Sequence, residues 1–311
     1  MLPKKTPTDL PFEFNSDVKQ QLLEGGAVVA LESTIITHGM PWPQNFETAC
    51  AVEDEVRKAG AIPATIAVLD GQVKVGLSNQ ELQKLAQTPD VDKLSRADLP
   101  ACIIKKRAGS TTVAATMLIA ELAGIKMFAT GGIGGVHVDV TNSFDISTDL
   151  TELAKTSVVV VCAGAKAILD LPKTFELLET YGVPVIGWRC DQLPAFWSRE
   201  SAIKSPIRLD NDKELAEFVA MRDRLGMEGG VLVCNPLPQS KEISQQVMQK
   251  MIDEALHAAQ QAGVRGKAVT PFLLSKLFDL SDGETLLCNV ALIRNNAKLA
   301  AQLAVQLASV S

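Results

Sequence analysis

The sequence is poor in aromatic residues and histidine, and its cysteines never stand close together. Aromatic side chains make up 5% of the 311 residues, and there are only three histidines. A metal site built from several histidines is therefore not expected, and any bound metal should be a hard ion held by carboxylates. The six cysteines are widely spaced and form no C-x-x-C motif. This spacing fits neither a disulfide framework nor a zinc ribbon.

Long apolar runs and an excess of positive charge are missing as well. No apolar run approaches the roughly 18 residues that a membrane span requires, and the opening MLPKKTP lacks the apolar stretch of a signal peptide. The formal net charge of −6 argues against a dedicated binder of nucleic acid or of anionic membranes. We therefore expect a cytoplasmic protein with no nucleic-acid partner and no membrane partner.

What the chain does have is a regular alternation of short apolar runs and amphipathic segments, which predicts an α/β layered fold. Buried strands are expected at 27–31, 64–69, 72–76, 127–130, 157–162, 183–188 and 230–234. Helices are expected at 16–25, 45–59, 111–123, 243–262, 271–278 and 284–307, and another after the Ser78/Glu81 capping box. Asp70-Gly71 lies between two apolar runs and indicates a hairpin, so the sheet should be mixed.

No fixed-period repeat and no long linker divides the chain. We therefore expect one domain over residues 1–311, with residues 1–14 as a flexible N-terminal arm and a helical flank at the C-terminus. In an open α/β sheet, ligands bind at the carboxyl ends of the strands. Three of the predicted strand ends carry unusual residues and are therefore candidate functional positions.

Glu32 closes the first apolar run. Partial burial there would raise the pKa of its carboxyl group and suit it to donating a proton. A carboxylate that caps a loop or pairs with a base would occupy the same place, and placement alone favours that structural role.

Four glycines within residues 131–135 follow the run at 127–130. Glycines let the backbone come close to a ligand. The third glycine of the dinucleotide fingerprint is missing, however, and residues 138–141 do not start a helix, so this fingerprint is not met. A phosphate or sugar loop and a merely tight turn are about equally supported.

Asp145 and Asp149 lie four residues apart with hydroxyl side chains between them. They could share a Mg²⁺ or Mn²⁺ ion, since such ions prefer oxygen ligands. Alternatively, Ser147 or Thr148 caps a helix and the aspartates favour its N-terminal dipole. The spacing alone favours the cap.

Lys166 follows a buried strand and a run of small residues. A lysine in apolar surroundings more readily provides a neutral amine, which attacks carbonyl carbons and forms Schiff bases. A lysine that extends to the surface or binds a phosphate as a point charge is about as compatible with this spacing. The polar cluster at 92–96 and the expected helix opening at 109–113 could also hold an anion, or be an ordinary capped helix beside a solvated turn.

Taken together, these segments resemble the pseudouridine-5′-phosphate glycosidases, also called the pseudouridylate synthase or indigoidine synthase A-like family. The resemblance runs from about residue 28 to 297 and is carried by long motifs: VALESTII at 29–36, HGMP at 38–41, FATGGIGGVH at 128–137, FDIS at 144–147 and VCAGAK at 161–166. Further matches are Asn235-Pro236, TPFLL at 270–274, Asn289 and Asn295-Asn296. The pattern departs from the family at Val138-Asp139 and at Asp92.

The resemblance implies an activity, a fold and partners. Members of the family reversibly cleave the C–C glycosidic bond of pseudouridine 5′-phosphate to uracil and ribose 5-phosphate. The implied architecture is a three-layer α/β/α fold with a mixed, mostly parallel sheet, assembled as a homotrimer. The implied cofactor is Mn²⁺ or another divalent metal, one per subunit. A separate pseudouridine kinase is the expected metabolic partner.

The resemblance also assigns roles to residues of this chain. Lys166 matches the nucleophile that forms a Schiff base at C1′ of the ring-opened ribose, Glu32 matches the general acid and Asp145 matches the metal ligand. The matching substrate contacts are Lys93, Val113, His137, Ser147, Thr148, Asp149 and Asn289. Two rival functions remain at this point. One is a Schiff-base aldolase or lyase acting on another sugar phosphate, and the other is a non-catalytic sugar-phosphate binding protein.

Overall fold

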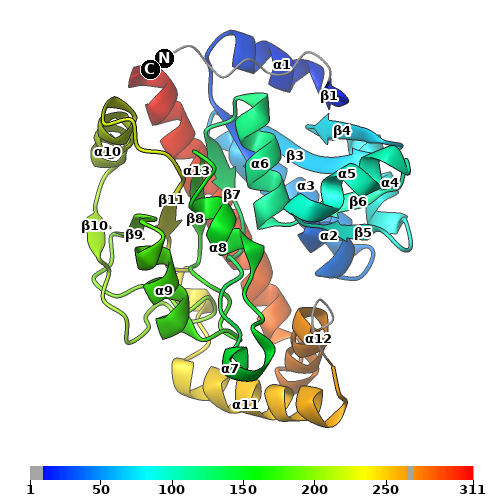
Figure 1. The fold of residues 1–311 in the computed structure, drawn as a ribbon, viewed down its shortest axis with the longest axis vertical. Coiled ribbons are helices and arrows are strands. Elements are labelled where there is room, and N and C mark those ends of the chain that lie inside the picture. The colour runs from blue at the N-terminus through cyan, green and yellow to red at the C-terminus, as the bar shows by residue number, and fades with distance from the viewer. Residues whose placement is uncertain (1–9, 265–268, 311) are drawn as a thin grey trace.

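The computed structural model describes residues 10–264 and 269–310, and its described strands form one 11-stranded sheet (Figure 1). The main path of the sheet runs β1-β4-β3-β2-β7-β8-β11-β9-β10, and β6 joins β5 to β3. The strands are β1 (Phe12–Phe14), β2 (Val28–Leu31), β3 (Ile62–Leu69), β4 (Gln72–Val75), β5 (Asp92–Leu94), β6 (Gly109–Thr111), β7 (Met127–Ala129), β8 (Val159–Cys162), β9 (Val185–Trp188), β10 (Ile207–Leu209) and β11 (Val231–Cys234). Every predicted strand is present.

Most neighbouring strands are parallel, and β3 accounts for the exceptions. It pairs antiparallel with β4 and with β6. The predicted hairpin joins β3 to β4, and its two central residues, Asp70 and Gly71, have φ angles of 53° and 79°. Positive φ at both positions is what a tight two-residue hairpin requires. The prediction of a mixed, mostly parallel sheet is confirmed.

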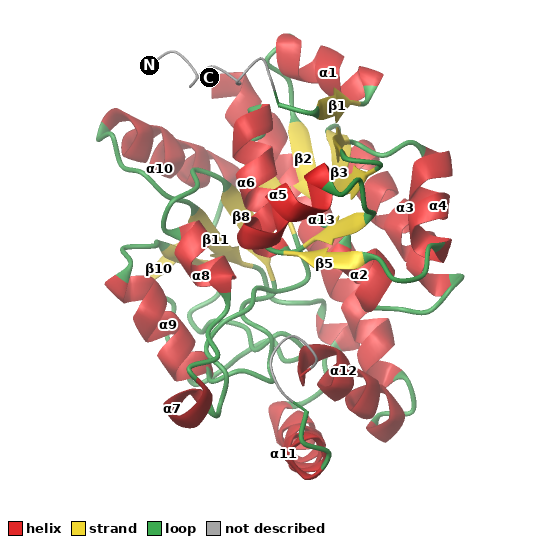
Figure 2. Ribbon diagram, turned by 45° about the vertical axis from the view of Figure 1, so that its right-hand side comes forward, coloured by secondary structure: helices red, strands yellow, loops and turns green. Residues whose placement is uncertain are grey.

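Helices cover both faces of this sheet (Figures 1 and 2). The helices are α1 (Ser16–Leu23), α2 (Thr34–His38), α3 (Gln44–Lys58), α4 (Asn79–Gln87), α5 (Leu99–Ile104), α6 (Val113–Ala123), α7 (Val140–Ser143), α8 (Thr148–Leu153), α9 (Leu171–Thr180), α10 (Asp212–Arg224), α11 (Gln245–Gln261), α12 (Val269–Leu280) and α13 (Glu284–Val310). In Figure 1, α6 lies in front of the central strands and α13 lies behind them, and both contact β2 and β7. The three-layer arrangement and the helical C-terminal flank are confirmed.

The sequence-based boundaries need three corrections. Within the expected N-terminal arm, Phe12–Phe14 form β1, which pairs with β4, so the arm prediction is wrong there; residues 1–9 lie outside the described part of the chain. Gly109–Thr111 form β6 rather than a helix opening, because they pair with β3 and β5. Val140–Ser143 form the short helix α7, contrary to the expectation that no helix starts there.

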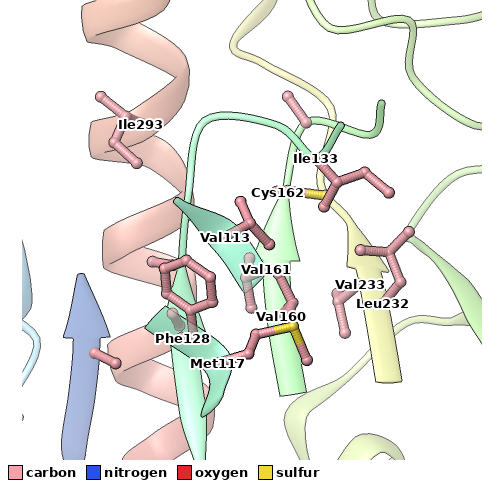
Figure 3. Close-up of a cluster of buried hydrophobic side chains, with 14 of the residues drawn as sticks. Val113, Met117, Phe128, Ile133, Val160, Val161, Cys162, Leu232, Val233 and Ile293 are labelled. Carbon is pink, nitrogen blue, oxygen red and sulfur yellow. The ribbon is translucent and has the colours of Figure 1, made fainter. Parts of the chain in front are cut away.

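The core lies where the central strands meet α6 and α13, as Figure 3 shows. Every residue of β2, β7, β8 and β11 is buried, because helices pack on both faces of these strands. Phe128, Val160 and Leu232 are fully enclosed. The ends of these strands are thus fixed by a dense core. None of the described helices has the length and hydrophobicity needed to cross a membrane.

Candidate active site

Three predicted positions meet because β2, β7 and β8 are adjacent and parallel. Their carboxyl ends lie at one edge of the sheet, and Glu32, Gly131 and Lys166 follow them. A pocket opens at this edge. Its polar lining consists of Glu32, Thr34, His38, Lys93, Lys166 and Asn289, and its apolar lining includes Ile35, Met40, Phe196, Pro271, Leu274 and Leu292. Four predicted site residues, Glu32, Lys93, Lys166 and Asn289, therefore line one pocket.

Glu32 has the surroundings of a proton donor. Burial raises the pKa of its carboxyl group; Lys166 and a hydrogen bond from Thr130 act in the opposite direction, and Asp149 reinforces the rise. Thr130 Oγ1 donates that hydrogen bond to Glu32 Oε1. A second, smaller cavity behind Glu32 is lined mainly by apolar side chains such as Val52 and Ile293, which explains the loss of solvation. The net effect is that Glu32 holds its proton to a higher pH than an exposed glutamate.

Lys166 is placed by the segment that follows β8. Gly164 has a φ of 86°, a conformation that glycine adopts without strain. Its carbonyl accepts a hydrogen bond from the backbone N–H of Ile133 at 3.1 Å, and the backbone N–H of Lys166 donates to the carbonyl of Ile133 at 3.1 Å. The side chain of Lys166 is half-buried. Two backbone hydrogen bonds to the neighbouring loop thus hold the base of this lysine beside Glu32.

The glycines after β7 are used for close packing. None of the four in residues 131–135 has a positive φ, so no left-handed turn requires them. A Cβ at Gly132 would lie 2.6 Å from the ring of Phe196, and one at Gly134 would lie 2.2 Å from Ser147 Oγ. Glycine is needed here because side chains from other segments press against the loop, while Gly131 and Gly132 face the pocket.

Asp149 joins this loop to the start of α6. Its Oδ1 accepts a hydrogen bond from the backbone N–H of Ala114 at 3.0 Å, and its Oδ2 accepts one from Gly134 at 2.8 Å. Ser147 is the N-cap of α8, and its hydroxyl accepts from the backbone N–H of Asp149. The helix-cap interpretation is therefore confirmed. Thr148 lies on the same turn, and its hydroxyl is 2.6 Å from that of Ser95.

Asp145 and His137 form a second polar group beside the pocket. His137 Nε2 lies 3.8 Å from Asp145 Oδ2. Burial lowers the pKa of His137, the carboxylate of Asp145 raises it, and the charges of Lys166 and Lys93 lower it further. Neither residue lines the pocket directly. In residues 10–264 and 269–310, no cluster of three or more His, Cys, Asp or Glu side chains could hold a metal.

The remaining predicted and unpredicted residues complete the site. Val113 begins α6 and its side chain is buried in the core, outside the pocket lining (Figure 3). Asp92, which adds a negative charge beside Lys93, pairs with Arg107 at 2.7 Å. His38 and Phe196 also line the pocket, and neither was predicted as a site residue. HGMP at 38–41 was a signal for His38, but the loop that carries Phe196 had none.

The comparisons with known proteins agree with this architecture. The profile of the family described as indigoidine synthase A like protein matches residues 17–306. The chain belongs to this family. A pseudouridine-5′-phosphate glycosidase of Jannaschia sp. (strain CCS1) is 57% identical over 295 residues, covering 95% of this chain and 98% of the relative. The enzyme of the same name from Solibacter usitatus is 54% identical, covering 95% and 99%.

Two solved structures have the same fold as this chain. The prealnumycin C-glycosynthase AlnA, crystallised in complex with ribulose 5-phosphate, superimposes with a TM-score of 0.90 at 37% identity, covering 98% of this chain and 99% of AlnA. An indigoidine synthase A-like protein from Thermotoga maritima gives a TM-score of 0.88 at 33% identity, with 96% and 97% covered. The resemblance seen in the sequence motifs is thus confirmed over the whole fold.

Proposed function

We propose that this chain reversibly cleaves the C–C glycosidic bond of pseudouridine 5′-phosphate, giving uracil and ribose 5-phosphate. The observation that carries the proposal is the convergence of Glu32 and Lys166 on one pocket at the ends of β2 and β8. Relatives that bear the name of this activity are more than 50% identical over nearly the whole chain. The C-glycosynthase AlnA was crystallised with a pentulose phosphate, which supports a sugar phosphate as ligand.

The lysine supplies the covalent step in this proposal. Uracil C5 is a poor leaving group, so the two-carboxylate route of ordinary glycosidases does not suit the bond. Lys166 Nζ bonds to C1′ and the ring oxygen leaves C1′ with a proton, which opens the sugar. The C1′–C5 bond then breaks as an iminium forms between C1′ and Nζ, and its electron pair stays on uracil C5. Water hydrolyses the iminium and releases ribose 5-phosphate and the free lysine.

Glu32 supplies the proton that uracil C5 needs. Burial raises the pKa of its carboxyl group, so Glu32 holds its proton to a higher pH than an exposed glutamate does, which suits a general acid. Since Oε1 accepts the hydrogen bond from Thr130, the proton belongs on Oε2. In the reverse direction, Glu32 takes the proton back and uracil C5 attacks the iminium carbon.

The sugar phosphate is proposed to lie toward Lys93. Lys93 is on β5, next to the start of α6 at Val113 and to the first turn of α8, where Ser147, Thr148 and Asp149 lie. A lysine binds a phosphate group as a point charge, and serine and threonine hydroxyls can donate hydrogen bonds to its oxygens. His137 and Asn289 complete the proposed set of substrate contacts.

A divalent metal is proposed to bind at Asp145. Its carboxylate is one-third exposed and its nearest side-chain partner is His137, which leaves it available as an oxygen ligand. Manganese and magnesium commonly keep several waters and need few protein ligands, so one carboxylate fits such an ion. When bound, the metal would supply positive charge that orients the substrate. Mn²⁺ binding followed by electron paramagnetic resonance should be lost in Asp145→Asn and kept in Asp139→Asn, six residues away.

The homotrimer and the supply of substrate by a pseudouridine kinase are also proposed, on the family resemblance. Light scattering of the purified chain tests the first, since a trimer of 33.3 kDa subunits is readily distinguished from a monomer. Coupled turnover of pseudouridine and ATP with a purified kinase tests the second.

Borohydride trapping tests the proposed function. The protein is incubated with ribose 5-phosphate and borohydride, and its intact mass and peptide map are measured. We expect a reduced adduct on the peptide that contains Lys166, absent in Lys166→Met and present in Lys213→Met, which changes an exposed lysine on α10. An unmodified wild-type protein that still binds ribose 5-phosphate would contradict the covalent mechanism.

The addition of uracil then separates the proposed activity from its rivals. The glycosidase makes pseudouridine 5′-phosphate from uracil and ribose 5-phosphate. A Schiff-base aldolase forms the adduct but makes no such product, and a sugar-phosphate binding protein forms neither.

A further inference from the structure

Asn289 is held in one orientation by a buried tryptophan. It lies near the start of α13, and Trp197 Nε1 donates a hydrogen bond to Asn289 Oδ1 at 2.9 Å. The Trp197 side chain is 1% exposed and packs edge-on against Phe196, with ring centroids 4.9 Å apart. An indole N–H is a donor only, so the atom that faces it must be the amide oxygen. The indole therefore decides which way the amide of Asn289 points.

This orientation leaves the other half of the amide to the pocket. Within the described part of the chain, no protein group accepts a hydrogen bond from Asn289 Nδ2, and Asn289 lines the pocket. The amide is planar, so its NH₂ group points away from Trp197. Asn289 therefore presents its NH₂ group, a hydrogen-bond donor, to the pocket. An amide in the opposite orientation would present its oxygen, an acceptor.

We propose that Asn289 donates a hydrogen bond to a carbonyl oxygen of the pyrimidine base, and that Trp197 is the positioning residue that makes it a donor. This inference rests on the proposed function and identifies the side chain that would select the base. Uracil presents carbonyl oxygens to such a donor. The exocyclic amine of cytosine would instead place donor against donor, and an unpaired buried donor is costly.

The surroundings favour the base over the phosphate at this end of the pocket. Leu292 follows Asn289 by one turn of α13, and Phe196, Pro271 and Leu274 line the same pocket. These side chains are apolar and suit the faces of a flat ring. The cation Lys93 comes from β5, an element of the sheet rather than of this helical wall. A cation stabilises a bound phosphate group, whereas apolar contacts and one directed hydrogen-bond donor stabilise a bound base.

The test measures KM for uracil and KM for ribose 5-phosphate separately in the synthetic direction. Asn289→Asp keeps an acceptor for Trp197 but replaces the NH₂ donor with an oxygen. We expect KM for uracil to rise at least about 10-fold, with KM for ribose 5-phosphate within about twofold of wild type. The control is Gln302→Glu, which adds the same charge to an exposed position of α13.

Trp197→Phe tests the positioning role, because it removes the N–H and keeps an aromatic ring. We expect KM for uracil to rise about 3- to 10-fold in Trp197→Phe, and thermal unfolding checks that this variant is folded. The control Gln302→Glu should leave KM for uracil unchanged. An unchanged KM for uracil in Asn289→Asp overturns the assigned hydrogen bond, as does a rise confined to KM for ribose 5-phosphate. An unchanged KM in Trp197→Phe overturns the positioning role. Wild-type protein that makes no pseudouridine 5′-phosphate would instead overturn the proposed function.

Discussion

The pocket has two walls of different construction. One wall is the carboxyl edge of the sheet, where Glu32 and Lys166 follow buried strands. The other is formed by α12, α13 and the loop at Phe196, and contributes Pro271, Leu274 and Leu292. The sheet wall supplies groups that can exchange protons or form bonds. The helical wall supplies apolar surface and one directed amide. In the proposed function, the chemical step and the recognition of the base therefore fall to different walls of the pocket.

The sheet wall is held by a network of hydrogen bonds that extends to α13, whereas α12 has a more peripheral position. Thr130, beside Glu32, donates its backbone N–H to Val161 at 3.0 Å, and its carbonyl accepts from Asn296 at 2.9 Å. Asn296 in turn accepts from Asn235 at 3.0 Å. By contrast, α12 lies outside the sheet and packs on α11 and α13. We therefore expect changes in the sheet wall to reduce kcat and changes in the helical wall to raise KM.

Lys166→Ala should have the largest effect. The proposed bond to C1′ cannot form without the amine, so cleavage of pseudouridine 5′-phosphate should fall by at least about 10³-fold. Stopped assays with separation of uracil measure this loss, and circular dichroism checks that the fold is intact. A folded variant with wild-type turnover would remove the covalent step and, with it, the chemical role given to the sheet wall.

Glu32→Gln should come next. The amide keeps the shape of the side chain but cannot give a proton to uracil C5, so kcat should fall by about 10²- to 10⁴-fold while KM changes little. The pH dependence follows from the raised pKa. Wild-type kcat for cleavage should be highest where Glu32 is protonated and should fall as the pH rises through that raised pKa. If kcat of Glu32→Gln still falls over the same pH range, another group is responsible for the pH dependence.

Thr130→Val should have a smaller effect on the same step. It removes the hydroxyl that donates to Glu32 and keeps the side-chain volume. We expect kcat to fall about 5- to 50-fold, since the acid loses one of its fixed contacts. That hydrogen bond lowers the pKa of Glu32. In Thr130→Val the decrease of kcat with rising pH should therefore occur at a higher pH. Thr130→Ser is the matched control, and an equal loss in both variants would point to packing instead.

The sequence was enough to predict most of the sheet wall. Strand patterns are local, and parallel strand ends meet at one edge, so Glu32 and Lys166 could be placed together before the structure was known. The cap at Ser147 was likewise a local signal that the structure confirms. The metal at Asp145 stays a prediction.

The helical wall was much harder to predict. Pro271 and Leu274 were recognisable as helix residues, but their approach to Glu32 depends on how α12 packs beyond the sheet. Phe196 has a φ of 63° in an irregular loop, a conformation without a sequence pattern. The bond from Trp197 to Asn289 joins residues 92 positions apart. Such contacts come from tertiary packing, and the spacing of hydrophobic residues along the sequence does not predict them.

Leu274→Ala should have the smallest effect and tests the helical wall directly. Leu274 is half-buried and lines the pocket, and part of its side chain would lose contact with the base. Loss of about 1 kcal/mol of apolar contact corresponds to about a fivefold rise in KM for uracil. We expect kcat to stay within about twofold, because the proposed reacting groups, Glu32 and Lys166, belong to the other wall. Leu287→Ala, at a position that is 65% exposed on α13, should change neither constant. A tenfold fall in kcat for Leu274→Ala would show that the helical wall also orients the reacting bond, and the division between the two walls would no longer hold.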